Sequence, residues 1–226
     1  MPRKSAVKSR AKSEAGATAT VSPPATRKRR SASKEQRRAQ LIKATIRCIA
    51  RKGLSGTTMA DVTRSAGLSM GIVNLHFQTK EKLLIETLRF VAEEYKNSWD
   101  GIASDPDLSP AEKVQAIIEQ DFSPGISQPD KLAVWFAFWG ESRSRPTYRN
   151  ICNEADLQTS ASMQTLCRQL GCKSRQRAEL IATGYTALAD GLWLDLLVTP
   201  DDMDRAMAAR ICRNYMASFF PEHFKV

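Results

Sequence analysis

The chain has 226 residues, of which 42% are hydrophobic and 26% are charged. This length allows one or two domains with a buried core, and the composition is ordinary for a folded protein. No apolar run approaches the roughly 20 residues that span a bilayer, and the N-terminus lacks the apolar segment of a signal peptide. We therefore expect a cytoplasmic protein without a membrane partner.

The formal net charge of +10 is concentrated at the N-terminus. Residues 1–38 contain 12 Lys and Arg against 2 acidic residues, which leaves 22 basic and 22 acidic residues in the remainder. Within that remainder, residues 39–90 carry a charge of +5 and residues 91–226 a charge of −5. A basic head before an acidic body is typical of a DNA-binding segment followed by a regulatory one.

Catalytic and metal-binding patterns are not found in the sequence. Five cysteines stand at irregular spacing, and His76 and His223 are the only histidines, so no set of metal ligands is formed. No Gly-rich phosphate loop is present, and no His stands beside a Ser or Cys nucleophile. We expect reduced thiols, no metal, no cofactor, no catalytic residue and no enzymatic activity.

Residues 1–33 are rich in Ala, Ser, Thr, Pro and basic residues, which predicts a disordered arm. The basic cluster at 27–30 has two interpretations. It lies along DNA phosphates or in a minor groove, or it is a solvated tail that adds only salt-sensitive affinity for any DNA. We favour the second interpretation.

A first helix is predicted over 34–52, where apolar residues recur at helical spacing before Gly53 ends the pattern. This face consists of Leu41, Ile42, Thr45, Ile46, Ile49 and Ala50.

Residues 57–80 read TTMADVTRSAGLSMGIVNLHFQTK and predict two short helices joined by a tight turn. Thr58 and Asp61 have the spacing of a capping box, and Gly67 supplies the left-handed conformation that ends a helix. Ser69 then caps a second helix over 70–76. Two such helices form a helix-turn-helix, whose second helix enters the major groove of DNA. The alternative is a helical hairpin without a DNA role, which the basic flanks disfavour.

The remaining chain is predicted to be helical throughout. We expect a long helix from Thr79 to about Gly101, a helix capped by Ser109, and then helices over 128–143, 145–170 and 175–198. A last helix begins at 199–202 and ends near 220. The fold class is therefore all-α, with a basic arm at 1–33, a three-helix DNA-binding domain at 34–80 and a helical ligand-binding and dimerisation domain at 81–226.

Two apolar helices carry a candidate ligand site. Trp135, Phe138 and Trp139 share one helical face, and Asp190 and Trp193 share another. Tryptophan rings with a carboxylate are the groups that bind quaternary ammonium ions. The alternative is a Trp-rich core in which Asp190 bonds to a hydroxyl or faces solvent, and the residues alone favour this core.

The pattern T-x-x-D-V-x-x-x-A-G-L-S-x-G-x-x-x-x-H-F-x-x-K-x-x-L, from Thr58 to Leu83, resembles the DNA-binding domain of TetR-type bacterial repressors. This resemblance implies a recognition helix at about 69–76. The implied base contacts come from Met70, Val73 and Asn74, and the implied phosphate contacts come from Thr58, Ser69, His76 and Lys80. Many relatives have Tyr at the position of Asn74, so this chain departs from the pattern there and leaves Asn74 to contact a base.

The segments Trp135–Trp139, Pro146–Arg149 and Leu188–Leu194 resemble the C-terminal domain of BetI-type repressors. The resemblance implies that choline or a related quaternary ammonium compound controls DNA binding. It also implies a homodimer that pairs through the last two helices and reads an imperfect palindrome in double-stranded DNA. The apolar faces expected to pair contain Leu180, Ile181, Leu188, Leu192, Leu196, Met203, Met207, Ile211, Tyr215 and Phe219.

Three other functions stay open at this point. The first alternative is a TetR-type regulator with an unrelated effector. The second is an architectural protein that binds DNA without sequence preference, and the third is an adaptor that binds another protein through its helical body. A specificity ratio between palindromic and random DNA separates the architectural protein from a repressor.

Overall fold

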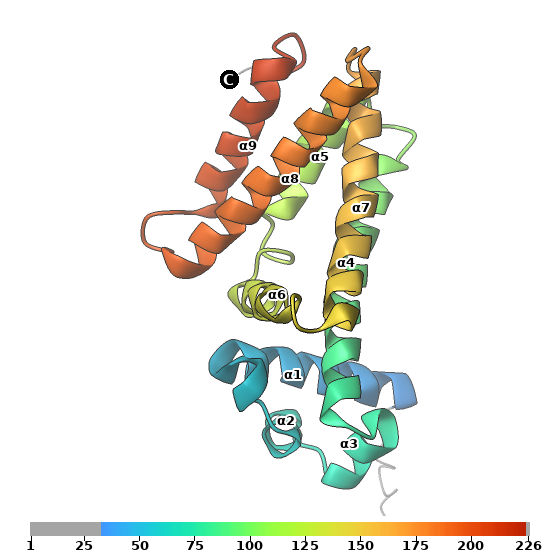
Figure 1. Ribbon diagram of the computed structural model, residues 1–226, viewed down its shortest axis with the longest axis vertical. Helices are drawn as coiled ribbons and strands as arrows, with labels where there is room; N and C mark the ends of the chain where they lie inside the picture. The colour runs from blue at the N-terminus through green and yellow to red at the C-terminus, as the bar shows by residue number, and fades with distance from the viewer. Residues whose placement is uncertain (1–32, 225–226) are drawn as a thin grey trace, which may run out of the picture. The chain divides into compact units, whose positions relative to one another are not determined.

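Helices account for all the regular structure in residues 33–224, the part of the chain that this computed structural model describes (Figure 1). The nine helices of this part are α1 (Lys34–Gly56), α2 (Met59–Ala66), α3 (Met70–Phe77), α4 (Lys80–Ala103), α5 (Pro110–Asp121), α6 (Pro129–Glu141), α7 (Pro146–Gln169), α8 (Arg175–Val198) and α9 (Arg205–Phe219). The all-α prediction is confirmed. The predictions for the arm and for the basic cluster at 27–30 lie outside the described residues, apart from Ser33.

Helix α1 begins at a capping box. The Ser33 hydroxyl accepts from the backbone N–H of Gln36, and the Gln36 side chain accepts from the N–H of Ser33. Ser33 therefore belongs to the folded part and not to the predicted arm. Gly53 kinks the helix instead of ending it, because its φ of 69° is left-handed and the helix resumes as far as Gly56.

Helix α4 connects the first three helices with the helices that follow it. Its Thr79 cap accepts from the N–H of Lys82 at 3.1 Å. The helix packs against α1 and α3 near its start and against α5, α6 and α7 along the body. Its 24 residues extend about 36 Å, so a tilt of α4 moves residues near the body and residues near α3 together.

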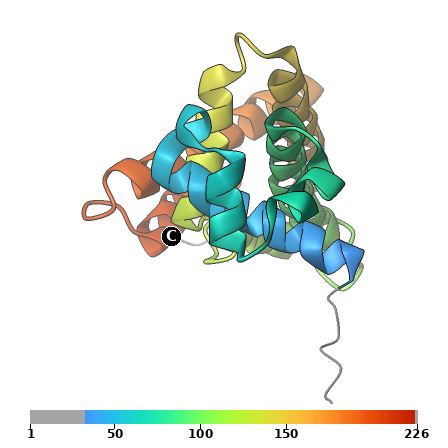
Figure 2. The same cartoon turned by 90° about the horizontal axis from the view of Figure 1, so that it is seen from below.

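Helix α6 lies between α1 and the body. It packs on α1 on one side and on α4, α7 and α8 on the other (Figure 1). In the view from below, the blue-to-teal helices α1–α3 lie nearest the viewer, with the body behind them (Figure 2). Helix α6 is therefore in direct contact both with α1 and with α4, α7 and α8.

The start of the last helix differs from its prediction. Residues 199–203 form a single turn, in which the Asp202 and Met203 N–H groups donate to the Thr199 carbonyl at 3.0 and 3.1 Å. Helix α9 begins only at Arg205, because the Asp204 carboxylate accepts from the Met207 N–H at 2.7 Å and makes the stronger cap.

Helix α8 is the one helix in residues 33–224 that is long and apolar enough, by length and composition, to cross a bilayer. A core helix of a soluble protein passes the same test. Ile181 and Leu192 of α8 are buried within the protomer, so neither is free to pair with a second chain as the sequence suggested. Helices α8 and α9 still expose an apolar stripe, which contains Leu180, Leu194, Val198 and Met207.

Candidate functional site

The cap at the start of α2 and the glycine that ends this helix are built as the sequence predicted. The Thr58 hydroxyl accepts from the Asp61 N–H at 3.1 Å, and the Asp61 carboxylate accepts from the Thr58 N–H at 3.2 Å. Hydrogen bonds from Lys52 and Thr58 lower the pKa of Asp61 to about 2, so the cap stays ionised. Gly67 has a φ of 64° and ends α2, and the Leu68 N–H donates to the Thr63 carbonyl at 3.0 Å.

Helix α3 exposes one face and buries the other. Met70, Asn74 and Leu75 are exposed, with Leu75 at 75% the most exposed large apolar side chain of the described residues. Val73 and Phe77 are buried against the domain core. A short helix with an exposed face of this kind, held by two turns, can enter a major groove.

The surroundings of α3 are basic. His76 lines a hollow with Arg38, Gln78 and Lys82, and Lys82 Nζ donates to Gln78 Oε1 at 2.6 Å. Lys80 is half-buried, and its ammonium donates to the Ser55 carbonyl at 3.2 Å. Arg38 is paired with Glu86 in this hollow, while Lys80 and Lys82 lie in the first turn of α4, directly after α3. Cations beside a DNA-binding helix can contact the phosphates that flank a groove.

A second site lies in the body, where aromatic rings surround Tyr95 of α4. The Tyr95 ring centroid is 6.0 Å from that of Trp99, 6.4 Å from that of Trp135 and 5.2 Å from that of Trp193. All three contacts are edge-to-face, at interplanar angles of 65°, 77° and 69°. We call these four residues the Tyr95 cluster, and they come from α4, α6 and α8.

A buried carboxylate supports this cluster. Asp121 is fully buried, and its two oxygens accept from Trp99 Nε1 and from the Tyr185 hydroxyl, each at 2.7 Å. Its backbone carbonyl accepts from Trp193 Nε1 at 3.0 Å. Burial raises the pKa of Asp121 to about 7, although the hydrogen bonds oppose this change. Asp121 thus fixes two tryptophans of the Tyr95 cluster through their indole N–H groups.

Two further carboxylates line a groove between α7 and α8. Asp156 and Asp190 are half-buried in this groove, whose volume is about 370 Å³. Burial raises the pKa of Asp156 to about 6, while burial and then the charge of Asp156 raise that of Asp190 to about 7. Burial, together with the charges of Asp121, Asp190 and Asp156, also raises the pKa of Tyr95, so all three act on the same ring.

None of these three carboxylates forms an ion pair with a basic side chain of residues 33–224. Burying a carboxylate without a cation costs free energy, and the raised pKa values report that cost. The combination of π faces and uncompensated acids therefore suits a small organic cation.

Comparison with known proteins identifies the family to which both parts of the chain belong. Residues 41–87 match the family described as bacterial regulatory proteins of the tetR family, and residues 110–221 match the BetI-type transcriptional repressor C-terminal family. The HTH-type transcriptional regulator BetI of Burkholderia mallei is 32% identical over 81% of this chain and 93% of its own length. The chain belongs to the TetR family. Its C-terminal domain is of the BetI type.

Solved structures of other regulators share the fold. A transcriptional regulator from Pseudomonas aeruginosa PAO1 is 28% identical, with a TM-score of 0.74 over 86% of this chain and 96% of its own. A regulator from Saccharomonospora viridis, solved in complex with choline, is 24% identical, with a TM-score of 0.68 over 80% of this chain and 96% of its own. This TetR-family chain is thus a transcriptional regulator and not an enzyme.

Some of the side chains predicted to contact DNA are buried or engaged in other hydrogen bonds, and others are exposed. Val73 is fully buried, so its side chain cannot touch a base, and we no longer assign it to the interface. Ser69 stands at the cap of α3, but its side chain makes no cap hydrogen bond, contrary to expectation. Thr58 has its hydroxyl engaged in the cap of α2. Sequence reasoning missed Leu75, whose exposure on a short helix only the packing reveals.

In the body, the structure brings together only part of the predicted ligand set. Trp135 and Trp193 belong to the Tyr95 cluster, and Trp139 contacts Trp135 with ring centroids 6.0 Å apart. The Phe138 ring instead packs on the Tyr148 ring, with centroids 4.7 Å apart and outside the Tyr95 cluster, so we no longer assign Phe138 to the site. Asp190 lies in the groove with Asp156.

Sequence reasoning did not single out Tyr95, Trp99, Asp121 and Asp156. One signal was readable for Asp121, since it continues the apolar face of Val114, Ile117 and Ile118 on α5. A lone acid on a buried face marks a carboxylate with a special role.

Proposed function

We propose that this TetR-family regulator is a dimeric, cytoplasmic repressor whose affinity for its operator is controlled by a small quaternary ammonium cation, with choline as the best candidate. The observation that carries the proposal is the Tyr95 cluster together with three carboxylates that have no basic partner in the described part of the chain. Two comparisons lend support: the BetI name of the relatives and the choline complex of the Saccharomonospora viridis regulator.

The chemistry of choline fits this site. Its trimethylammonium group is a cation without hydrogen-bond donors, so it needs π faces and negative charge more than acceptor geometry. The Tyr95 cluster supplies four rings. Asp156 and Asp190, in the groove between α7 and α8, would supply acceptors for the choline hydroxyl and negative charge for the ammonium, and the charges of both already act on Tyr95.

Ligand entry would move α4. Each of the three tryptophan rings contacts the Tyr95 ring, which therefore lies between them. A trimethylammonium group therefore displaces the Tyr95 ring, and packed interiors respond to such displacement by shifting whole elements. Because α4 carries both Tyr95 and Lys80, this shift reaches the DNA-binding domain.

Helix α6 provides a second connection. Lys131 at its start pairs with Glu94 of α4. Arg145, just beyond its end, lies 3.7 Å from Glu81 of α4 and 3.6 Å from Glu141 of α6. Helix α6 also carries Trp135 and Trp139 and packs on α1. Movement of these rings is thus linked to α4 and α1, and a coupling of about 1–3 kcal/mol would change operator affinity about 5- to 150-fold.

The DNA contacts follow from the exposed face of α3. Met70 and Asn74 would contact base edges, with Asn pairing to adenine and Met touching a thymine methyl. Phosphate contacts would come from Thr58, Ser69, His76 and Lys80. Of these, Lys80 must exchange its bond to the Ser55 carbonyl for a phosphate.

Dimerisation would use the exposed apolar stripe of α8 and α9. The exposure of these apolar side chains supports an interface there, and pairing would cover the apolar face of α8. Two recognition helices would then lie about 34 Å apart on an imperfect palindrome.

The direct test is calorimetric titration of the purified regulator with choline and with 3,3-dimethylbutan-1-ol, which replaces the ammonium nitrogen by carbon and keeps the shape. We expect choline to bind at least about tenfold more tightly, because the neutral analogue gains nothing from the rings' negative faces or the carboxylates. Equal affinity for both compounds, or no binding of choline, would overturn the effector assignment. Release of operator by an unrelated compound would then identify a regulator of another pathway.

A further inference from the structure

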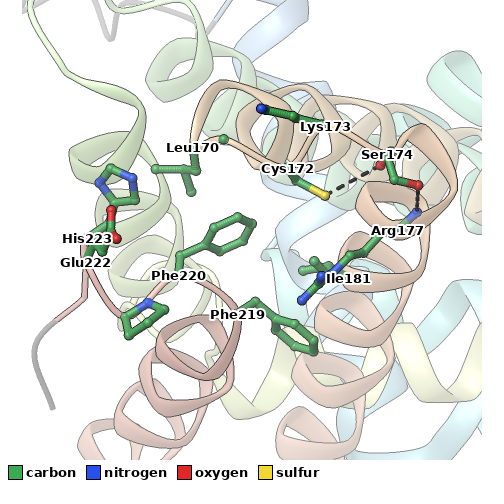
Figure 3. Close-up of a pocket in the computed structure, with 12 residues that line it drawn as sticks. Leu170, Cys172, Lys173, Ser174, Arg177, Ile181, Phe219, Phe220, Glu222 and His223 are labelled. Carbon is green, nitrogen blue, oxygen red and sulfur yellow. Dashed lines mark hydrogen bonds between the residues drawn. The ribbon is translucent and has the colours of Figure 1, made fainter.

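A second cavity lies at the end of the body that is farther from α2 and α3 (Figure 1). Three segments meet there: the turn between α7 and α8, the first turns of α8, and the chain from the end of α9 to His223 (Figure 3). Gly171, with a φ of 103°, lets the chain reverse direction at this turn. The cavity volume is about 450 Å³, within the range of small-molecule sites.

The base of this cavity is apolar. Leu170, Ile181 and Phe220 are 6%, 2% and 7% exposed, and the Phe220 ring points into the space (Figure 3). Phe219, which is half-buried, forms one edge. An apolar base of this kind accommodates an aliphatic or aromatic group.

The rim is polar and carries net positive charge. Lys173 and Arg177 outnumber the one acidic residue, Glu222, and His223 also lies on the rim. The Arg177 guanidinium lies beside Ile181 and Phe219 at the edge of the apolar base (Figure 3). Neither Lys173 nor Arg177 lies within ion-pair distance of a carboxylate of residues 33–224. A planar guanidinium in this position is suited to a carboxylate.

We propose that this cavity is a second ligand site, which binds a small organic monocarboxylate through Arg177 and seats its apolar group against Ile181, Phe219 and Phe220. This site is opposite in charge preference to the Tyr95 cluster, which lies beside three acids. Because its walls are the ends of α7, α8 and α9, an occupant stabilises the packing of α8 on α9.

The test compares 3-phenylpropionate with its neutral amide, 3-phenylpropanamide, by calorimetric titration of the full chain. We expect the carboxylate to bind at least about tenfold more tightly than the amide. We expect Arg177→Gln to remove that preference. The matched control is Arg168→Gln, an exposed arginine on α7 outside the cavity, which should leave it unchanged.

Two results would overturn the proposal: no binding of 3-phenylpropionate to the wild type, or equal binding by wild type and Arg177→Gln. Thermal unfolding of each variant shows whether it is folded. Choline titration of Arg177→Gln distinguishes the carboxylate site from the choline site. Choline should bind this variant as it binds wild type, because Arg177 is not part of the Tyr95 cluster.

Discussion

Asn74 is exposed on α3, and the proposed function assigns its amide to a base edge. We expect Asn74→Ala to weaken operator binding by about 1–3 kcal/mol, the value of one bidentate base contact, and to leave binding to random DNA unchanged. Val73→Ala is the comparison, because Val73 is buried and its truncation lowers the free energy of unfolding instead. Fluorescence anisotropy measures the affinity of each variant for operator and for random DNA, and urea unfolding measures the stability of each variant. An equal loss on operator and random DNA would exclude base reading by Asn74.

Asp156 and Asp190, in the groove between α7 and α8, predict how the affinity for choline depends on pH. A cation binds the ionised forms, and the pKa values of Asp156 and Asp190 are raised to about 6 and about 7. Protons therefore compete with choline at low pH, and choline affinity should rise by about tenfold or more between pH 5 and pH 8.

Asp190→Asn should bind choline more weakly at pH 8 and show a flatter pH profile, as titrations across this range would reveal. The same raised pKa values have a consequence for stability. Between about pH 4 and pH 7 the Asp190 carboxyl keeps its proton in the folded state and has lost it in the unfolded state. The contribution of Asp190 to the free energy of unfolding therefore falls as the pH rises through this range. A choline affinity that decreases toward pH 8 would contradict the assignment of these acids.

The close packing of helices α8 and α9 depends on Gly184. A Cβ on Gly184 would lie 2.0 Å from the Tyr215 hydroxyl, which donates to the Ile181 carbonyl at 3.0 Å. Gly184→Ala therefore breaks this bond, and we expect it to be less stable than Gly101→Ala by about 1–2 kcal/mol. Gly101 is the control because a Cβ there meets nothing within 4 Å.

Urea unfolding measures the difference between the two glycine variants, and Tyr215→Phe in the Gly184→Ala background should recover part of the loss. If the two alanine variants were equally stable, the close contact between α8 and α9 would have no energetic weight.

Helix α6 is expected to transmit the ligand signal through Arg145. We predict that Arg145→Gln binds choline within about twofold of wild type but shows a smaller choline-induced change in operator affinity, because the link between Glu141 and Glu81 is lost. Arg143→Gln, an exposed neighbour without an ion pair among the described residues, is the control. Anisotropy titrations of operator with and without choline measure the coupling, and unchanged coupling in Arg145→Gln would rule out this route.

Local signals in the sequence predicted most of the helices, because caps and breakers act within a few residues. Thr58 with Asp61 and the glycine at 67 placed α2 correctly. The predicted start of α9 was wrong, since Thr199 and Asp204 are both of the residue types that cap helices and the structure uses Asp204. The Tyr95 cluster was largely missed for a different reason. Its members come from helices far apart in the chain, and their meeting depends on how those helices cross.

At the scale of the whole molecule, dimerisation is expected to involve α8 and α9. Leu180 is 66% exposed, and its replacement by Glu should convert the dimer to a monomer and abolish tight operator binding. Leu157→Glu, on α7 and 71% exposed, is the matched control and should leave the dimer intact. Sedimentation velocity distinguishes the two states, and a dimeric Leu180→Glu protein would place the interface elsewhere.

The most direct test of the account measures operator and random-DNA affinity, over a range of salt, for wild type, Met70→Ala/Asn74→Ala and a truncated chain of residues 33–226. We predict that the double variant loses the preference for operator, whereas the truncated chain keeps that preference and loses only salt-sensitive affinity. Base reading by α3 would be contradicted if the double variant bound operator like wild type while removal of residues 1–32 abolished binding.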